Sequence, residues 1–309
     1  MNAATETSLL VARELRRSVR SVKGIILGII TLVGAVIASI AVVWMQGSEL
    51  ERAGSQAALD ELNRKMVERG TGDAALAAHI ASMPQSLRTF LDITVWLAPL
   101  LIALLGFDGV AGELQHKAVR FWTVRSRRSS YFAGKLLGLW ALVALVILVL
   151  NVIVGAVAVA KGYVSAFDLL KWGTLFWLVA VVIAGAWAAI ATLISSLTKQ
   201  PIAALLTTFG VFFLLWLSNT VGAALRAREV IRQTREAMEQ LGEAGQTADA
   251  MSPPVLPPMH WYEYLYPNGY ETMLLSTEIS KVLMALAVLL GFVVVVTVGG
   301  SLVFAKRDL

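Results

Sequence analysis

A short connector at residues 107–135 concentrates charge between two long apolar segments. It reads FDGVAGELQHKAVRFWTVRSRRSSYFAGK and holds two acidic and six basic residues. Side chains of opposite charge at short spacing form ion pairs within a helix, and charged patches complement those of a partner protein. Phe121 and Trp122 stand among these bases. A link that only reverses the chain needs little more than a turn, so this composition predicts an interaction element.

Residues that could support catalysis or metal binding do not gather in the sequence. The absence of cysteine excludes disulfides, thiolate metal sites and cysteine nucleophiles. His79, His116 and His260 are scattered, with no His-x-x-x-His pair and no accompanying carboxylate cluster. Met259 beside His260 is a candidate soft-metal pair, but it offers too few ligands, so we predict packing there. We expect a non-catalytic chain that binds no cofactor, no metal and no nucleic acid.

Composition places the chain in a membrane. Of its 309 residues, 57% are hydrophobic and 15% are charged, and the mean hydropathy is +0.72. Soluble domains are about 25% charged, so the deficit is large. We therefore interpret the basic residues behind the pI near 9.6 as determinants of orientation in the bilayer rather than of nucleic-acid binding.

The sequence predicts an all-α integral membrane protein with six transmembrane helices. A span needs about 20 apolar residues. One apolar stretch, between Asp92 and Asp108, is too short to cross the hydrocarbon core of the bilayer, because a helix rises about 1.5 Å per residue. Either one of these aspartates lies at the membrane boundary, or residues before Phe90 extend that helix. The other five stretches are uncharged and long enough, at residues 24–45, 136–160, 172–198, 201–225 and 282–305.

Charge predicts the orientation. With six spans both termini share a side, and that side also carries the 107–135 connector and the turn at 198–200. It holds fourteen of the 26 bases and five of the 21 acids, a net charge of +9, against −4 (twelve bases, sixteen acids) on the other side. The positive-inside rule therefore predicts cytoplasmic N- and C-termini.

Residues 1–23 predict an amphipathic helix ahead of the transmembrane domain at 24–309. Val11, Leu15, Val19 and Val22 recur at helical spacing, and the arginines lie mostly on other faces. Such a helix lies in the interface with its bases near anionic headgroups. A frayed basic tail is the alternative. The segment is unlike a cleaved signal, because a full span follows and no A-x-A-like site does.

Two segments, 46–89 and 226–280, are predicted outside the cell. The first is rich in alanine and mixed charge and suits one or two surface helices. The second opens with Arg232–Glu236 and Arg235–Glu239 at four-residue spacing, which predicts that the fifth span continues outward as a solvated helix. Its later aromatic residues suit the outer headgroup level, or else an outer gate: Trp261, Tyr262, Tyr264 and Tyr266.

The connector has two interpretations of equal weight. If the second span runs helically past Asp108, then Glu113, Lys117 and Arg120 share one face, and Glu113 can pair with Lys117. Leu114, Ala118, Phe121 and Trp122 make the other face. This arrangement suits docking of a soluble partner. A positive-inside anchor packed against lipid fits the same residues.

The connector resembles that of the ABC-2-type permease family, the membrane subunits of ABC transporters. In that family an acid follows the second span, a Glu opens the connector, and a basic stretch ends in Gly-Lys. The matching positions here are Asp108, Glu113, Arg125, Ser126, Arg127 or Arg128, Gly134 and Lys135. The N-terminal helix, the six spans, the turn SSLTKQP and the C-terminal FAKRDL extend the resemblance. Two features depart from it: Lys117-Ala118-Val119 replaces the usual Gly-Thr, and the usual Pro near Ser126 is absent.

The resemblance implies a mechanism. The 108–134 connector would be the coupling element of a permease in the bacterial inner membrane, seated on a separate cytoplasmic ATP-binding subunit. This chain has no G-x-x-x-x-G-K-[ST] loop, so ATP and magnesium would bind that subunit. A second copy, or a related permease, would complete an exporter. The implied coupling residues are Asp108, Glu113, Lys117, Arg120, Phe121, Trp122, Arg125, Arg127 and Arg128.

Polar residues within the spans are candidates for a translocation path. Asn151, Ser218 and Asn219 are of this kind, although an interhelical hydrogen bond suits Asn151 equally well. Several glycines predict close helix packing: Gly28, Gly34, Gly185, Gly291, Gly299 and Gly300. The alternative function is a non-transporting membrane partner of an ABC ATPase, whose outer segments relay its motion to an extracytoplasmic protein.

Overall fold

The computed structural model describes residues 3–50, 74–117, 119, 121, 127–243, 257 and 259–305, and every regular element in these ranges is helical. Six of the helices are long and apolar enough to cross a membrane, which confirms the six predicted spans. They are α2 (Val22–Leu50), α5 (Gln85–Gly106), α8 (Arg128–Ala160), α9 (Ala166–Leu197), α10 (Pro201–Glu243) and α12 (Ile279–Ala305).

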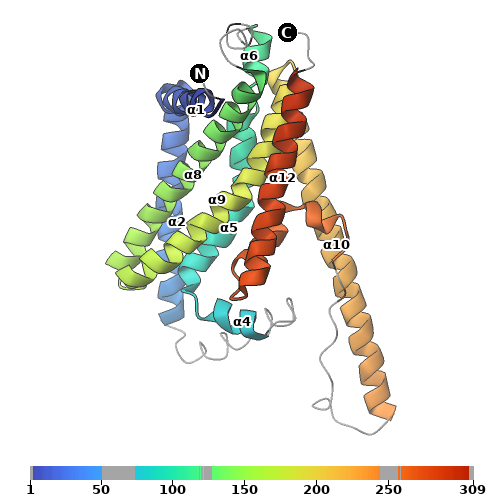
Figure 1. The fold of residues 1–309 in the computed structure, drawn as a ribbon. Helices are drawn as coiled ribbons and strands as arrows, with labels where there is room; N and C mark the ends of the chain where they lie inside the picture. The colour runs from blue at the N-terminus through green and yellow to red at the C-terminus, as the bar shows by residue number, and fades with distance from the viewer. Residues whose placement is uncertain are drawn as a thin grey trace.

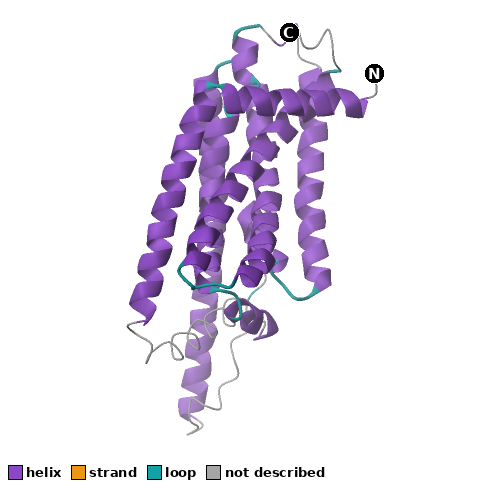
Figure 2. Cartoon of the chain, turned by 90° about the vertical axis from the view of Figure 1, so that its left-hand side faces the viewer, coloured by secondary structure: helices purple, strands orange, loops and turns teal. Residues whose placement is uncertain are grey.

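The helices form a bundle whose two ends differ (Figures 1 and 2). At one end α1 (Ala3–Arg20) lies across the bundle, and the last turn of α12 lies at the same end. At the opposite end lies α4 (Ala74–Ala81). The segment with η2 (Glu263–Leu265), η3 (Pro267–Tyr270) and α11 (Glu271–Leu274) reaches from that side into the bundle, where Asn268 donates to the carbonyl of Val95 and accepts from the indole N–H of Trp187. The described chain therefore starts and stops at the same end of the bundle, as an even number of spans requires. That this end is cytoplasmic stays a prediction.

The centre of the bundle is α9. It contacts α5, α8, α10 and α12, and small residues along it let those helices approach closely. At Gly185 an added Cβ would lie 2.8 Å from the indole of Trp140, and Trp187 packs edge-on against Phe212 with ring centroids 4.5 Å apart. The long apolar helix at the centre is thus held by aromatic side chains of its neighbours.

The helix that forms the second span has different bounds from the uncharged stretch between Asp92 and Asp108. Helix α5 starts at Gln85, so residues before Phe90 extend it and Asp92 lies within the helix. It ends at Gly106, so the condition under which Glu113, Lys117 and Arg120 would share one helical face is not met. The third span also starts early, at Arg128, which puts the last residues of the 108–134 connector inside α8.

Helix α10 continues far beyond the bundle at the end opposite α1 (Figure 1). It reaches Glu243, which confirms that the helix of the fifth span continues well past its apolar stretch, while its extracytoplasmic side stays a prediction. Arg232 lies 3.7 Å from Glu236, as its spacing predicts. The side chain of Glu239 and the structure of residues 51–73 lie outside the described part of the chain.

Close packing is confirmed at two of the predicted glycines, Gly185 and Gly300. An added Cβ at Gly300 would lie 2.5 Å from the ring of Phe132. At four others an added Cβ would meet no atom of the described residues within 4 Å, so close packing there stays a prediction: Gly28, Gly34, Gly291 and Gly299.

Candidate functional site

Ser195 of α9 fixes the turn that ends α5. Its buried hydroxyl accepts hydrogen bonds from the backbone N–H groups of Val110 and Ala111, at 3.1 and 3.0 Å, and donates one to the carbonyl of Phe107 at 2.9 Å. The first N–H groups of a helix have no partner within it, so this hydroxyl supplies what a new helix needs. The chain therefore bends and starts α6 (Ala111–Gln115).

The bend changes the direction of Glu113. Its side chain turns into the protein and is 4% exposed, whereas Lys117 is exposed and follows α6 in a left-handed conformation with φ of 55°. The predicted shared face of Glu113 and Lys117 is therefore wrong. That prediction assumed one continuous helix, and Ser195 interrupts it.

Glu113 instead belongs to a buried charged cluster, here called the junction, which joins α1, α6 and α8. Lys135 Nζ lies 2.7 Å from Glu113 Oε1 and 2.7 Å from Glu14 Oε1. Tyr131 donates its hydroxyl hydrogen to Glu113 Oε2 at 2.7 Å, and Arg17 forms an ion pair with the same carboxylate. Buried ions need such partners, because removing them from water is costly. The junction consists of Glu14, Arg17, Glu113, Tyr131 and Lys135.

Two glycines let α1 sit directly on α8. An added Cβ at Gly134 would lie 2.6 Å from Leu10 Cβ, and one at Gly138 would lie 2.8 Å from Glu14 Cβ. Both positions fall on one face of α8, four residues apart, with Lys135 beside them. The Gly-Lys pair at residues 134 and 135 thus has a physical role. The glycine admits α1, and the lysine neutralises the two glutamates brought together.

An apolar cluster beside the junction brings in α12. The ring of Tyr131 stacks on Phe304 with centroids 5.6 Å apart, among the buried side chains of Val110 and Val119. The Arg128 guanidinium donates a hydrogen bond to the carbonyl of Ala305 at 2.5 Å. Movement of the connector would therefore act on four elements: α1, α6, α8 and α12.

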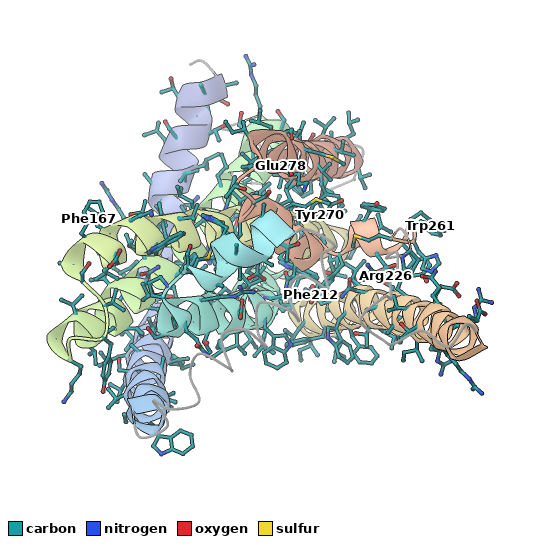
Figure 3. All side chains as sticks on the ribbon, turned by 90° about the horizontal axis from the view of Figure 1, so that it is seen from below. Phe167, Phe212, Arg226, Trp261, Tyr270 and Glu278 are labelled. Carbon is teal, nitrogen blue, oxygen red and sulfur yellow. The ribbon has the colours of Figure 1, made fainter. Side chains whose placement is uncertain are left out.

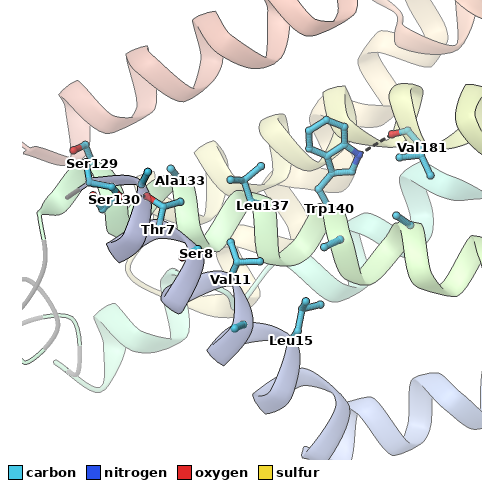
Figure 4. Close-up of a pocket in the computed structure, with 15 residues that line it drawn as sticks. Thr7, Ser8, Val11, Leu15, Ser129, Ser130, Ala133, Leu137, Trp140 and Val181 are labelled. Atoms are coloured by element: carbon cyan, nitrogen blue, oxygen red, sulfur yellow. Dashed lines mark hydrogen bonds between the residues drawn. The ribbon is translucent and has the colours of Figure 1, made fainter. Parts of the chain in front are cut away.

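A broad apolar groove of about 920 Å³ lies on one side of the crossing of α1 and α8 (Figure 4). Hydroxyl residues such as Thr7 and Ser129 lie toward one end, and Trp140 lies toward the other. The indole N–H of Trp140 donates to the carbonyl of Val181 at 2.7 Å, which fixes the ring. This open, apolar surface suits contact with lipid tails.

The predicted coupling residues divide into groups. Glu113 is in the junction, and Asp108 lies close enough to Arg17 to interact with it electrostatically. Phe121 is 75% exposed, as a docking side chain requires. The backbone N–H of Arg127 donates to Glu6 of α1 at 3.3 Å. Three others lie outside the described residues: Arg120, Trp122 and Arg125.

The polar residues within the spans have local partners. The buried Asn151 amide donates to the carbonyl of Gly173 at 3.0 Å, which is an interhelical hydrogen bond between α8 and α9. Ser218 donates to the carbonyl of Leu215 in its own helix, and Asn219 is half-buried. The role of all three in a translocation path stays a prediction.

The opposite end holds a second buried carboxylate. Glu263 is fully buried, pairs with Arg226 of α10 and accepts the backbone N–H of His260 at 2.8 Å. Figure 3 views this end and shows Arg226 on α10 beside the segment that carries Trp261. Trp261 is exposed, as an interfacial residue would be, but Tyr266 is buried against Trp187 and packs inside the bundle.

The ring of His260 stacks on Tyr262, with centroids 5.2 Å apart. Among the described residues no three histidine or carboxylate side chains gather as metal ligands.

Sequence reasoning missed several residues of the site. Ser195, Glu14 and Tyr131 were not predicted, because their partners are 18 to 121 residues away along the chain. The signal that could have found the α1 contact is the pair Gly134 and Gly138, four residues apart at the start of a span. Such spacing of small residues marks close helix contact.

Fold and site define a polytopic membrane protein with a charged connector built into one end of its bundle and no nucleotide-binding motif of its own. A family model described as ABC-2 family transporter protein matches residues 9–309. The chain belongs to this family and is a permease component of an ABC transporter. Comparison with curated proteins gives no match.

Proposed function

We propose that this chain is the permease of an ATP-driven exporter and that its connector receives the motion of a separate ATP-binding subunit. Two copies, or one copy and a related permease, would form the path. The observation that carries the proposal is the junction, because it joins the connector to α8 and α1 through the buried pairs of Lys135 with Glu113 and Glu14, and to α1 again through Arg17. Burial protects such pairs from the screening that weakens surface pairs.

In this proposal Phe121 is the side chain that docks on the ATP-binding subunit. A large exposed aromatic ring next to basic residues suits a partner groove with an acidic rim. Its place beyond α6 means that a force on it acts on the turn held by Ser195 and on Glu113. Nucleotide-driven closure of two ATP-binding subunits would then tilt α1 and α8 in both permease copies, in the manner of alternating access.

The chain lacks cysteine, which makes crosslinking a direct test. We expect Phe121→Cys, carrying a short thiol-reactive photocrosslinker, to crosslink to the co-expressed ATP-binding subunit in membranes. Phe167→Cys is the matched control, since Phe167 is also 75% exposed but lies at the start of α9, at the other end of the bundle. Crosslinking at 167 and none at 121, in an assembled complex, would overturn both the connector assignment and the orientation.

The second candidate function, a relay to an extracytoplasmic protein, is favoured by one observation. Helix α10 extends beyond the bundle as a charged helix that reaches Glu243. ATP hydrolysis by the complex that responds to small amphiphiles supports the exporter. Hydrolysis that depends on an added extracytoplasmic protein, and that Ile231→Asp on the exposed face of α10 abolishes, supports the relay.

A further inference from the structure

A half-enclosed cavity of about 330 Å³ lies on the other side of the α1–α8 crossing from the apolar groove. Its walls come from α1, the start of α2, the end of α5 with the following turn, α8, and Thr192 of α9. Small-molecule sites have volumes of about 300–1,000 Å³ and combine apolar walls with a few polar groups. The cavity fits this description.

The cavity is divided into a charged part and an apolar part. Charged and hydroxyl side chains line the part next to α1: Glu14, Arg17, Ser18, Ser21, Asp108 and Lys135. Leucines line the part that leads into the spans: Leu27, Leu105, Leu139 and Leu142. Leu27 and Leu142 belong to one buried apolar cluster, against which Leu105 packs. A ligand that matches both parts has a polar head and a hydrocarbon tail.

The charged side chains of the cavity determine which type of lipid headgroup it can bind. Four charged side chains line the cavity, Arg17 and Lys135 against Glu14 and Asp108, and their sum is zero. The Glu113 carboxylate behind them bonds to both cations and makes the sum of the five groups −1. A net anionic head would face uncompensated carboxylates. A zwitterionic head places its phosphate at the guanidinium and its ammonium at the carboxylates.

The geometry allows both contacts. The Arg17 side chain is 56% exposed, and a guanidinium has five N–H donors, so its pairing with Glu113 leaves donors for a phosphate. A carboxylate has about four lone-pair sites, so Asp108 can accept an ammonium in addition to its interaction with Arg17. The tail would then follow Leu27 and Leu105 into the apolar part.

We propose that this cavity binds one zwitterionic phospholipid, of the phosphatidylethanolamine type, from the leaflet on the α1 side. Because Glu14, Arg17 and Lys135 are both junction residues and cavity walls, the bound lipid stabilises the contact of α1 with the α5–α6 turn. The site goes beyond the exporter proposal. That this leaflet is the cytoplasmic one rests on the orientation proposed above.

Native mass spectrometry of delipidated protein in detergent tests the site. The added probes are dioleoyl-phosphatidylethanolamine and dioleoyl-phosphatidylglycerol, each titrated separately. We expect one phosphatidylethanolamine per chain at a concentration at least tenfold below that needed for phosphatidylglycerol. Leu105→Trp fills the cavity and should weaken binding at least tenfold. Leu137→Trp is the matched control, because Leu137 lines the apolar groove on the other side of α1, and should leave binding unchanged.

Asp108→Asn gives a second test that does not change the packing. It should reduce the preference for phosphatidylethanolamine to less than threefold while the protein stays monodisperse. Equal binding of the two lipids by the unaltered protein, or a preference that Asp108→Asn and Leu105→Trp leave intact, would overturn the proposal. The measurement uses no ATP-binding subunit, so its failure is separate from failure of the exporter proposal.

Discussion

Two buried glutamates lie at opposite ends of this bundle, and each is paired with an arginine. Glu263 joins η2 to α10, and its other partner is the N–H of His260, three residues earlier in the chain. Glu113 joins α6 to α1 and α8 and has three side-chain partners, one of them 96 residues away. Glu263 therefore fastens one outer segment to one helix, whereas Glu113 links elements that could move together.

The largest expected effect comes from removing the cation at each end. Lys135→Met leaves Glu14 and Glu113 buried without their shared ammonium, and Arg226→Met leaves Glu263 buried without its guanidinium. Breaking a buried ion pair costs about 3–5 kcal/mol in the free energy of unfolding. The two costs should be similar, as measured by chemical unfolding in detergent.

The location of the effect should differ between these two variants. Hydrogen–deuterium exchange should rise in α1, α6 and the start of α8 for Lys135→Met. For Arg226→Met it should rise at residues 259–274 and leave α1 unchanged. If hydrogen–deuterium exchange rose in a single element in each variant, the two ends of the bundle would not differ in the way described.

A smaller effect is expected where α1 crosses α8. Gly138→Val forces a side chain against Glu14, and overpacking of this kind costs about 1–3 kcal/mol. Gly210→Val on α10 is the control, since an added Cβ there meets no atom of the described residues within 4 Å. Thermal unfolding should show a lower midpoint for Gly138→Val than for Gly210→Val. Equal midpoints would mean that α1 does not depend on this contact.

Ser195→Ala should weaken the turn between α5 and α6. It removes the acceptor of two buried N–H groups, and unsatisfied buried groups cost about 1–3 kcal/mol. Ser301→Ala, whose hydroxyl bonds only within α12 in the described structure, is the control. Proteolysis of the connector should be faster in Ser195→Ala and unchanged in Ser301→Ala. Unchanged proteolysis in both would show that the bend has another cause.

The smallest effect concerns pH at the side of the bundle opposite α1. Burial, together with the adjacent Asp92, raises the pKa of Glu271 from 4.5 to about 8, against the opposing effect of Arg88. Between these two pKa values the folded protein holds a proton that the unfolded chain has released, so stability falls as pH rises from about 5 to 8.

Asp92 is half-exposed, which limits this pH effect to about 1 kcal/mol after allowance for solvent screening. Glu271→Gln should flatten the dependence of the unfolding midpoint on pH. Lys281→Gln, which alters an exposed pair with Glu278, should not. A slope that Glu271→Gln does not change would assign the titration to another group.

Much of the fold could be predicted from the sequence, because hydropathy and charge act over a single segment. The six spans, the helical continuation of α10 past its apolar stretch and the Arg232–Glu236 pair follow from such local patterns. The position of the site in the sequence could be predicted, but the contacts among its side chains could not. The partners of Glu113 depend on a hydroxyl in α9 that bends the chain and on glycines in α8 that admit α1. The hydroxyl contact leaves no periodic signal, and the α1 contact is marked by nothing more than the four-residue spacing of Gly134 and Gly138.

ATP hydrolysis by the reconstituted complex tests the central claim most directly. Glu113→Gln and Glu263→Gln each replace a buried carboxylate by an amide of the same size, one at each end of the bundle. With the ATP-binding subunit present in equal amount, we predict that Glu113→Gln lowers the rate at least tenfold and that Glu263→Gln stays within twofold of the unaltered protein. Equal loss in both variants, or loss in Glu263→Gln alone, would contradict the assignment of coupling to the junction.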